Sequence, residues 1–78
     1  MRIAVELTFR TMDPISQEVG MTLWEGVEQF KSIGARTYKL TVHGDCDNII
    51  SALDTVVHDV NAKIPQLVVV TKLVAEVL

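Results

Sequence analysis

The sequence predicts an α+β fold in which two helices pack on one face of a small sheet, forming a two-layer sandwich. Two observations support this prediction. Segments with strand-like alternation and segments with helical spacing follow one another in the order β-α-β-α-β. The chain has 78 residues, of which 49% are hydrophobic, and no repeat or linker divides it. We therefore expect a single domain that spans residues 1–78.

The first predicted strand covers residues 2–10. Its apolar residues alternate with polar or small ones: Ile3, Val5, Leu7 and Phe9 alternate with Ala4, Glu6, Thr8 and Arg10. Successive side chains of a strand point to opposite faces of a sheet. The apolar set should therefore face the core, and the other set should face solvent or a partner.

The first predicted helix covers residues 16–33. Ser16 is its candidate N-cap, Thr22 with Glu25 gives a second capping-box-like signal, and Gly34 is expected to end it as a left-handed C-cap. Trp24 is placed on the flank of the apolar stripe. That stripe consists of Val19, Leu23, Val27, Phe30 and Ile33.

The second half of the chain predicts a strand, a helix and a strand. The strand over residues 36–43 should place Tyr38, Leu40 and Val42 on one face and Lys39, Thr41 and His43 on the other. The helix, from about residue 49 to about residue 62, should be capped by Asp45 or Asp47. Its apolar residues are Ile49, Ile50, Leu53, Val56, Val57 and Val60. The last strand, over residues 66–74, contains three consecutive valines and is expected to be buried on both faces.

One feature of the topology has two interpretations. A ferredoxin-like βαββαβ sandwich needs two strands between its helices, but only residues 35–44 are left for them. These residues either form one strand, giving a reduced βαβαβ variant with a shortened central hairpin, or two short strands. The segment lacks the turn residues that a tight hairpin prefers. A single strand would pair with an edge from a neighbouring segment or another subunit.

The composition of the chain favours a second copy of itself as its partner over a nucleic acid or a membrane. The apolar content exceeds what so small a sheet can cover, which favours a homo-oligomer, a dimer or tetramer formed through sheet faces or edges. A net charge of −3 with seven scattered basic residues argues against nucleic-acid binding. The longest apolar run, residues 67–70, is too short to span a membrane. The single Cys46 and the lack of a signal-peptide pattern predict a cytoplasmic location.

Four segments carry a resemblance to a known family. They are Leu-Thr-Phe-Arg-Thr-Met at residues 7–12, Gly34 followed by Tyr38-Lys-Leu, His43-Gly-Asp before Ile-Ile-Ser-Ala-Leu at residues 49–53, and Leu-Val-Val-Val-Thr-Lys-Leu at residues 67–73. With these segments the chain resembles the YKOF-related, thiamine-binding family of small ferredoxin-like domains. The resemblance implies a non-catalytic protein that binds thiamine or its hydroxymethylpyrimidine half and associates through its sheets. The chain is shorter than the family pattern between Tyr38 and Gly44, where the family has a full hairpin beside its ligand pocket.

The resemblance implies a ligand site and no cofactor. In that site Trp24 or Tyr38 would stack on the heterocycle, while Thr8, Glu28, Thr41 and His43 would supply polar contacts. Each of these residues also has a structural interpretation. Trp24 is typical of a core edge or an interface, and Tyr38 of packing beneath a helix. The polar residues of the two strands are typical of cross-strand pairs or a subunit contact.

His43, Asp45, Cys46 and Asp47 form the only cluster of chemically active side chains in the sequence. A zinc site would need further ligands, and a Cys-His nucleophile pair would need an orienting group and an oxyanion hole. The favoured interpretation is structural: the two aspartates cap a helix, the cysteine lies in a turn, and the histidine ends a strand. We therefore expect no enzyme, no catalytic residue and no metal site.

Overall fold

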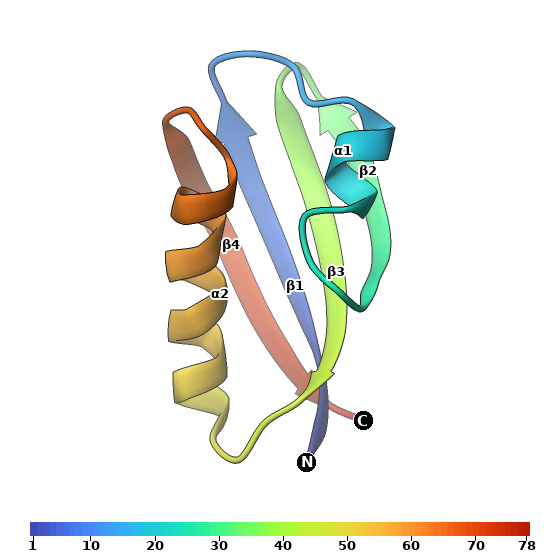
Figure 1. Cartoon of the computed structure of the whole chain (residues 1–78), viewed down its shortest axis with the longest axis vertical. Coiled ribbons are helices and arrows are strands. Elements are labelled where there is room, and N and C mark those ends of the chain that lie inside the picture. The colour runs from blue at the N-terminus through green and yellow to red at the C-terminus, as the bar shows by residue number, and fades with distance from the viewer.

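The computed structural model describes residues 1–78 and shows a four-stranded antiparallel sheet with two helices (Figure 1). The elements are β1 (Arg2–Thr11), α1 (Gln17–Met21), β2 (Val27–Gly34), β3 (Thr37–Asp45), α2 (Ile49–Lys63) and β4 (Val68–Val77). The strand order across the sheet is β2-β3-β1-β4. The predicted α+β class is confirmed.

β1 is a central strand, and its predicted alternation is confirmed. Ile3, Val5, Leu7 and Phe9 are all buried. The other face of β1 carries Glu6, which lies opposite Thr41 of β3 and pairs with Lys39 at 3.6 Å between Nζ and Oε2. Tyr38 and Leu40 of β3 share one face, as predicted, and the structure buries them beside Phe9 and Leu7.

The prediction of one long helix over residues 16–33 is wrong. Ser16 does cap α1, since its Oγ accepts a hydrogen bond from the Val19 amide, but the helix ends after five residues. Thr22 is the C-cap of α1 rather than the start of a capping box. Gly26 has φ of +87°, a conformation that no continuing helix can include. The chain beyond Gly26 therefore leaves the helical path and forms β2.

The question of the missing strand is resolved by β2. Residues 35–44 contribute only one strand, and the second strand between the helices comes from residues that helical spacing had placed in the first helix. Phe30 of that segment lies opposite Leu40 of β3. The reduced βαβαβ alternative is thus wrong. Gly34 is not a left-handed cap, and Arg36, with φ of 51°, takes the left-handed position in the β2–β3 turn.

α2 matches its predicted range, but its cap and its packing differ from prediction. Asn48, rather than Asp45 or Asp47, is the N-cap, and its Oδ1 accepts from the Ser51 amide at 3.1 Å. Val60 is the only fully buried residue of the helix, and Ile50 is 72% exposed. The N-terminal half of α2 therefore packs less closely on the sheet than its C-terminal half.

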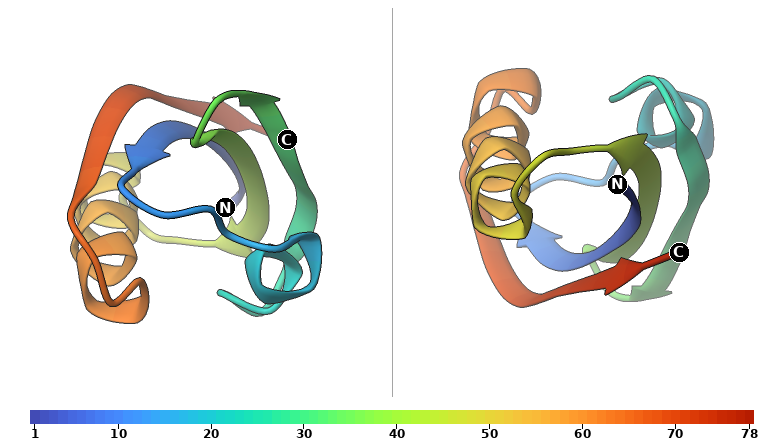
Figure 2. Two further views of the ribbon diagram at one scale, coloured as in Figure 1. Left: turned by 90° about the horizontal axis from the view of Figure 1, so that it is seen from above. Right: turned by 90° about the horizontal axis from the view of Figure 1, so that it is seen from below.

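β4 is an edge strand, and the prediction that it is buried on both faces is wrong. Val68 is buried, but Val69 and Val74 are 52% and 44% exposed on the face that no helix covers. Seen along the long axis, the sheet curves so that β4 runs beside α2 and β2 beside α1 (Figure 2). Consecutive valines predict a strand but do not distinguish a central one from an edge one.

The core lies toward one end of the molecule. Phe30 stacks on Tyr38 with 5.1 Å between ring centroids, and both contact Phe9. Val60 and Ile64 join this cluster from the C-terminal end of α2. Ile3 and Val5 are buried but lie outside the cluster, at the opposite end of the sheet. The helix-bearing face therefore has a second, less filled region beside the N-terminal half of α2.

Candidate functional site

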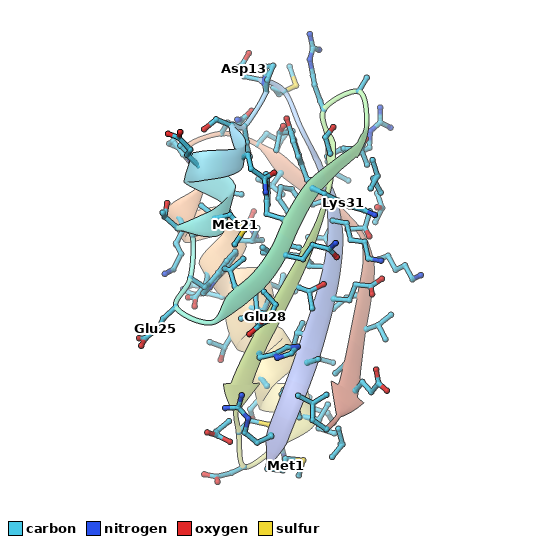
Figure 3. All side chains as sticks on the ribbon, turned by 90° about the vertical axis from the view of Figure 1, so that its right-hand side faces the viewer. Met1, Asp13, Met21, Glu25, Glu28 and Lys31 are labelled. Carbon is cyan, nitrogen blue, oxygen red and sulfur yellow. The ribbon has the colours of Figure 1, made fainter.

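The structure divides the six predicted ligand residues between the two sides of the sheet. Four of them lie on the open face, which no helix covers: Thr8, Glu28, Thr41 and His43. The pairing of β2 with β3 shifts by one residue between Val27 and Gln29. Glu28, which lies at this shift, points to the open face (Figure 3). Its Oε1 lies 3.6 Å from Nδ1 of His43, an ion pair only when the imidazole is protonated. Thr8 lies opposite Lys39, and Thr41 opposite Glu6.

The two aromatic residues of the predicted site lie on the helix side. Tyr38 is 5% exposed, and its hydroxyl oxygen accepts a hydrogen bond from the Ile15 amide at 2.7 Å. Trp24 donates from Nε1 to Asp59 Oδ2 at 3.4 Å, and Nζ of Lys63 lies 5.5 Å from its ring centroid. Tyr38 is therefore a core residue, and Trp24 holds the loop after α1 against α2. The structure does not bring either ring together with the four polar residues.

A cleft of about 460 Å³ opens where α2 packs less closely on the sheet. Its floor consists of apolar side chains from β1 and β3, namely Ile3, Val5 and Val42. One wall is the N-terminal half of α2, which contributes Ser51, Ala52, Thr55 and Val56. The turn over residues 44–48 closes one end. Small side chains on α2 leave room above the floor, and this explains why the space is not filled.

The rim of the cleft is polar and acidic. Asp45 and Asp47 are its only ionisable residues besides Cys46, and no Lys, Arg or His lines it. Asp45 is paired with Arg2 at 3.6 Å, whereas Asp47 forms no ion pair. The N-terminal ammonium donates to the Cys46 carbonyl at 2.7 Å, and the Cys46 amide donates to the Met1 carbonyl at 2.9 Å. These bonds tie the turn to the start of β1, so the rim is attached to the sheet at two points.

The cluster at residues 43–47 is split by the sheet. His43 lies on the open face with Glu28, whereas Cys46 lines the cleft on the helix side. The structure thus does not bring the thiol and the imidazole together. No three His, Cys, Asp or Glu side chains gather in an arrangement that could hold a metal ion. Asp45 ends β3 and Asp47 lies in the turn, so neither caps α2.

Sequence reasoning missed the cleft, although a signal for it was present. Ser51, Ala52 and Thr55 are small residues on the side of α2 that faces the sheet, between larger apolar residues of the predicted stripe. Small residues on a helix face that should fill a core leave space there. A smaller hollow of about 340 Å³ lies between α1 and the end of α2, lined in part by Ile15, Val19 and Lys63.

Comparison with protein-family models, curated proteins and solved structures found no match to this chain. Neither helix is long and apolar enough to cross a membrane.

Proposed function

We propose that the chain is a ferredoxin-like domain that binds a small heterocyclic ligand without catalysing a reaction. The element order β-α-β-β-α-β and the strand order β2-β3-β1-β4 support the fold assignment. The observation that carries the function is the cleft beside α2. Its volume lies within the range of small-molecule sites, about 300–1,000 Å³, and it combines an apolar floor with a few polar groups at the rim.

The charges at the rim favour a neutral or cationic ligand. Two carboxylates line the cleft, but Arg2 pairs with Asp45 and the N-terminal ammonium bonds the Cys46 carbonyl, so Asp47 is the carboxylate left to attract a cationic ligand. Thiamine and its hydroxymethylpyrimidine half, which the family resemblance suggests, fit this condition, since the thiazolium ring is cationic. The hydroxyls of Ser51 and Thr55 and the side chain of Asn48 could bond the amino group and ring nitrogens. The apolar floor would contact the ring face.

Isothermal titration calorimetry with thiamine and with hydroxymethylpyrimidine tests this function. We expect saturable binding by the unmodified chain. In Ala52→Leu, the larger side chain occupies the cleft from α2, where leucine is an acceptable helix residue, and binding should be lost. The matched control is Ala62→Leu, the same substitution at an exposed position of the same helix. It should bind as the unmodified chain does.

Two results would contradict the proposal. No heat with either compound at millimolar concentration would remove these ligands. Binding that persists unchanged in Ala52→Leu would place the site elsewhere, either in the hollow beside α1 or among the polar residues of the open face. Circular dichroism of both variants establishes that the fold is retained.

A second candidate function is that of a homo-oligomeric interaction module without a small ligand. The exposed apolar residues favour it. Five of them, Leu67, Val69, Val74, Val77 and Leu78, lie in or next to β4, with exposures of 44–70%. Sedimentation of the unmodified chain measures its assembly directly, and a particle that remains a monomer at high micromolar concentration would contradict this candidate.

A further inference from the structure

β4 presents an unusual free edge. It is ten residues long, contains no proline and has only two charged residues, Lys72 and Glu76. Its one register shift lies at Thr71, so the stretch from Lys72 to Val77 is regular. Natural edge strands are normally protected by charges, prolines, bulges or short length, because an unpaired strand is a template for another strand. β2, the other edge strand, has eight residues and two register shifts. The C-terminal half of β4 also runs away from α2, so no helix covers it there (Figure 2).

The backbone groups that β4 offers follow from its register with β1. The Leu78 amide donates to the Arg2 carbonyl at 3.0 Å, and from Lys72 onward each residue of β4 lies opposite one residue of β1. In an antiparallel pair, alternate residues direct both backbone groups toward the neighbouring strand. The even-numbered residues from Lys72 to Leu78 therefore bond β1. Leu73, Ala75 and Val77 direct their amides and carbonyls outward.

The two charges of β4 are complementary to those of a second β4 strand in one register. Lys72 and Glu76 both lie on the open face, and neither forms an ion pair within the chain. If β4 pairs antiparallel with β4 of a second copy about a two-fold axis, one register alone places Lys72 opposite the partner's Glu76. In that register Val74 lies on the axis, opposite its own equivalent. Leu73 then lies opposite the partner's Ala75, so the outward backbone groups of both strands meet.

We propose that the free edge of β4 binds β4 of a second copy of this chain, with Val74 on the two-fold axis. Each Lys72 then pairs with a Glu76 across the axis, and the two four-stranded sheets join into one continuous sheet. The segment from Lys72 to Glu76 supplies about four interchain backbone hydrogen bonds. This proposal is independent of ligand binding, because the edge of β4 contributes no residue to the cleft beside α2.

Cysteine cross-linking tests the register. At a non-hydrogen-bonded antiparallel pair the Cα atoms are about 4.5 Å apart, which a disulfide spans. In a Cys46→Ser background, Val74→Cys should therefore form a covalent dimer under mild oxidation. The matched control, Val69→Cys in the same background, replaces a valine on the same face of β4 and leaves both ion pairs intact, but its two thiols lie ten residues apart along the paired strands. It should not cross-link beyond the level of random collision.

Charge reversal tests the same contact without a covalent bond. Lys72→Glu sets two pairs of carboxylates against each other, and the dissociation constant of the dimer should rise at least about tenfold. The double variant Lys72→Glu/Glu76→Lys restores opposite charges and should recover most of the affinity. Lys31→Glu makes the same change on β2, the other edge strand, and should leave the dissociation constant unchanged. Sedimentation equilibrium measures all four proteins.

Each outcome decides the proposal. Dimers that cross-link through Val74→Cys and recover in the double charge swap support it. A monomer at millimolar concentration overturns it, as does a dimer that Lys72→Glu leaves intact. A dimer that Lys31→Glu weakens instead would place the interface at β2. Calorimetry with the Ala52→Leu variant measures ligand binding in the cleft independently of dimer formation. The dimer proposal can therefore fail without affecting the ligand proposal, and the reverse also holds.

Discussion

Gly20 of α1 lies against the aromatic core, and replacing it with alanine should destabilise the fold. A Cβ atom built on Gly20 overlaps Cγ, Cδ1 and Cε1 of the Phe30 ring. Phe30 is 2% exposed and is held between Phe9 and Tyr38, so the ring has no free space into which to move. The added methyl group must therefore displace either the ring or the whole of α1.

The magnitude follows from two opposed effects. Overfilling a packed core costs about 1–3 kcal/mol. Replacing glycine by alanine inside a helix returns up to about 1 kcal/mol. The net loss for Gly20→Ala should thus be about 1–2 kcal/mol in the free energy of unfolding. In a domain of this size that corresponds to a decrease in Tm of about 4–16 °C.

Gly44→Ala is the matched control for this substitution. A Cβ atom at Gly44 meets nothing within 4 Å, and the backbone there is not left-handed. Alanine at that position should be neutral or should stabilise the fold by up to about 1 kcal/mol, because it lowers the conformational entropy of the unfolded chain. Thermal and urea unfolding at one fixed protein concentration compare the two variants. If Gly20→Ala were as stable as Gly44→Ala, α1 would not pack on Phe30 as the structure has it.

The local turns and caps yield two further predictions. Asn48→Ala removes the side chain that accepts a hydrogen bond from the Ser51 amide, so it should lower the free energy of unfolding by about 1 kcal/mol. Asp47→Ala, the control, should change that free energy by less than about 0.5 kcal/mol. Equal losses in urea titrations of both variants would refute the assignment of the cap. Arg36→Gly relieves the left-handed backbone of the β2–β3 turn, so the midpoint of urea unfolding should rise by the equivalent of about 0.5–1 kcal/mol. A decrease in that midpoint would count against the turn geometry.

The parts of the fold that were predicted correctly depend on strong local patterns. The alternation from Ile3 to Phe9 has period 2 without interruption, and all four apolar residues are buried. The range of α2 was also correct, because its apolar residues follow helical spacing from Ile49 to Val60. In β1 local preference and tertiary packing agree throughout, whereas in α2 they agree only in the C-terminal half, around Val60.

The first helix was mispredicted because β2 shows no strand alternation: Phe30 is its only buried residue, and two register shifts interrupt its pairing with β3. Leu23, Val27 and Phe30 match helical spacing, yet Phe30 also lies opposite Leu40 in the sheet. Pairing with β3 and stacking on Tyr38 stabilise the strand beyond Gly26, and such tertiary contacts routinely override weak helix propensity. The two glycines, Gly20 and Gly26, were the local signal against a long helix.

The candidate site was less accessible to sequence reasoning than the fold. The six ligand residues were assigned by resemblance, and the structure places Trp24 and Tyr38 on one side of the sheet and the polar four on the other. The cleft depends on how closely α2 approaches β1 and β3. The small residues Ser51, Ala52 and Thr55 are a local signal for space there, but the distance itself also depends on packing at the far end of the helix, around Val60.

Mapping a titration by two-dimensional amide NMR tests the central claim most directly, because it shows where a ligand binds. With thiamine or hydroxymethylpyrimidine added, the largest shifts should fall on the amides of Cys46, Asn48, Ser51 and Ala52, at the rim and wall of the cleft. The amides of Glu28 and Lys39, two residues that do not line the cleft and whose side chains lie on the open face, should not move. Shifts concentrated on those two residues, or no shifts at saturating ligand, would contradict a binding cleft beside α2.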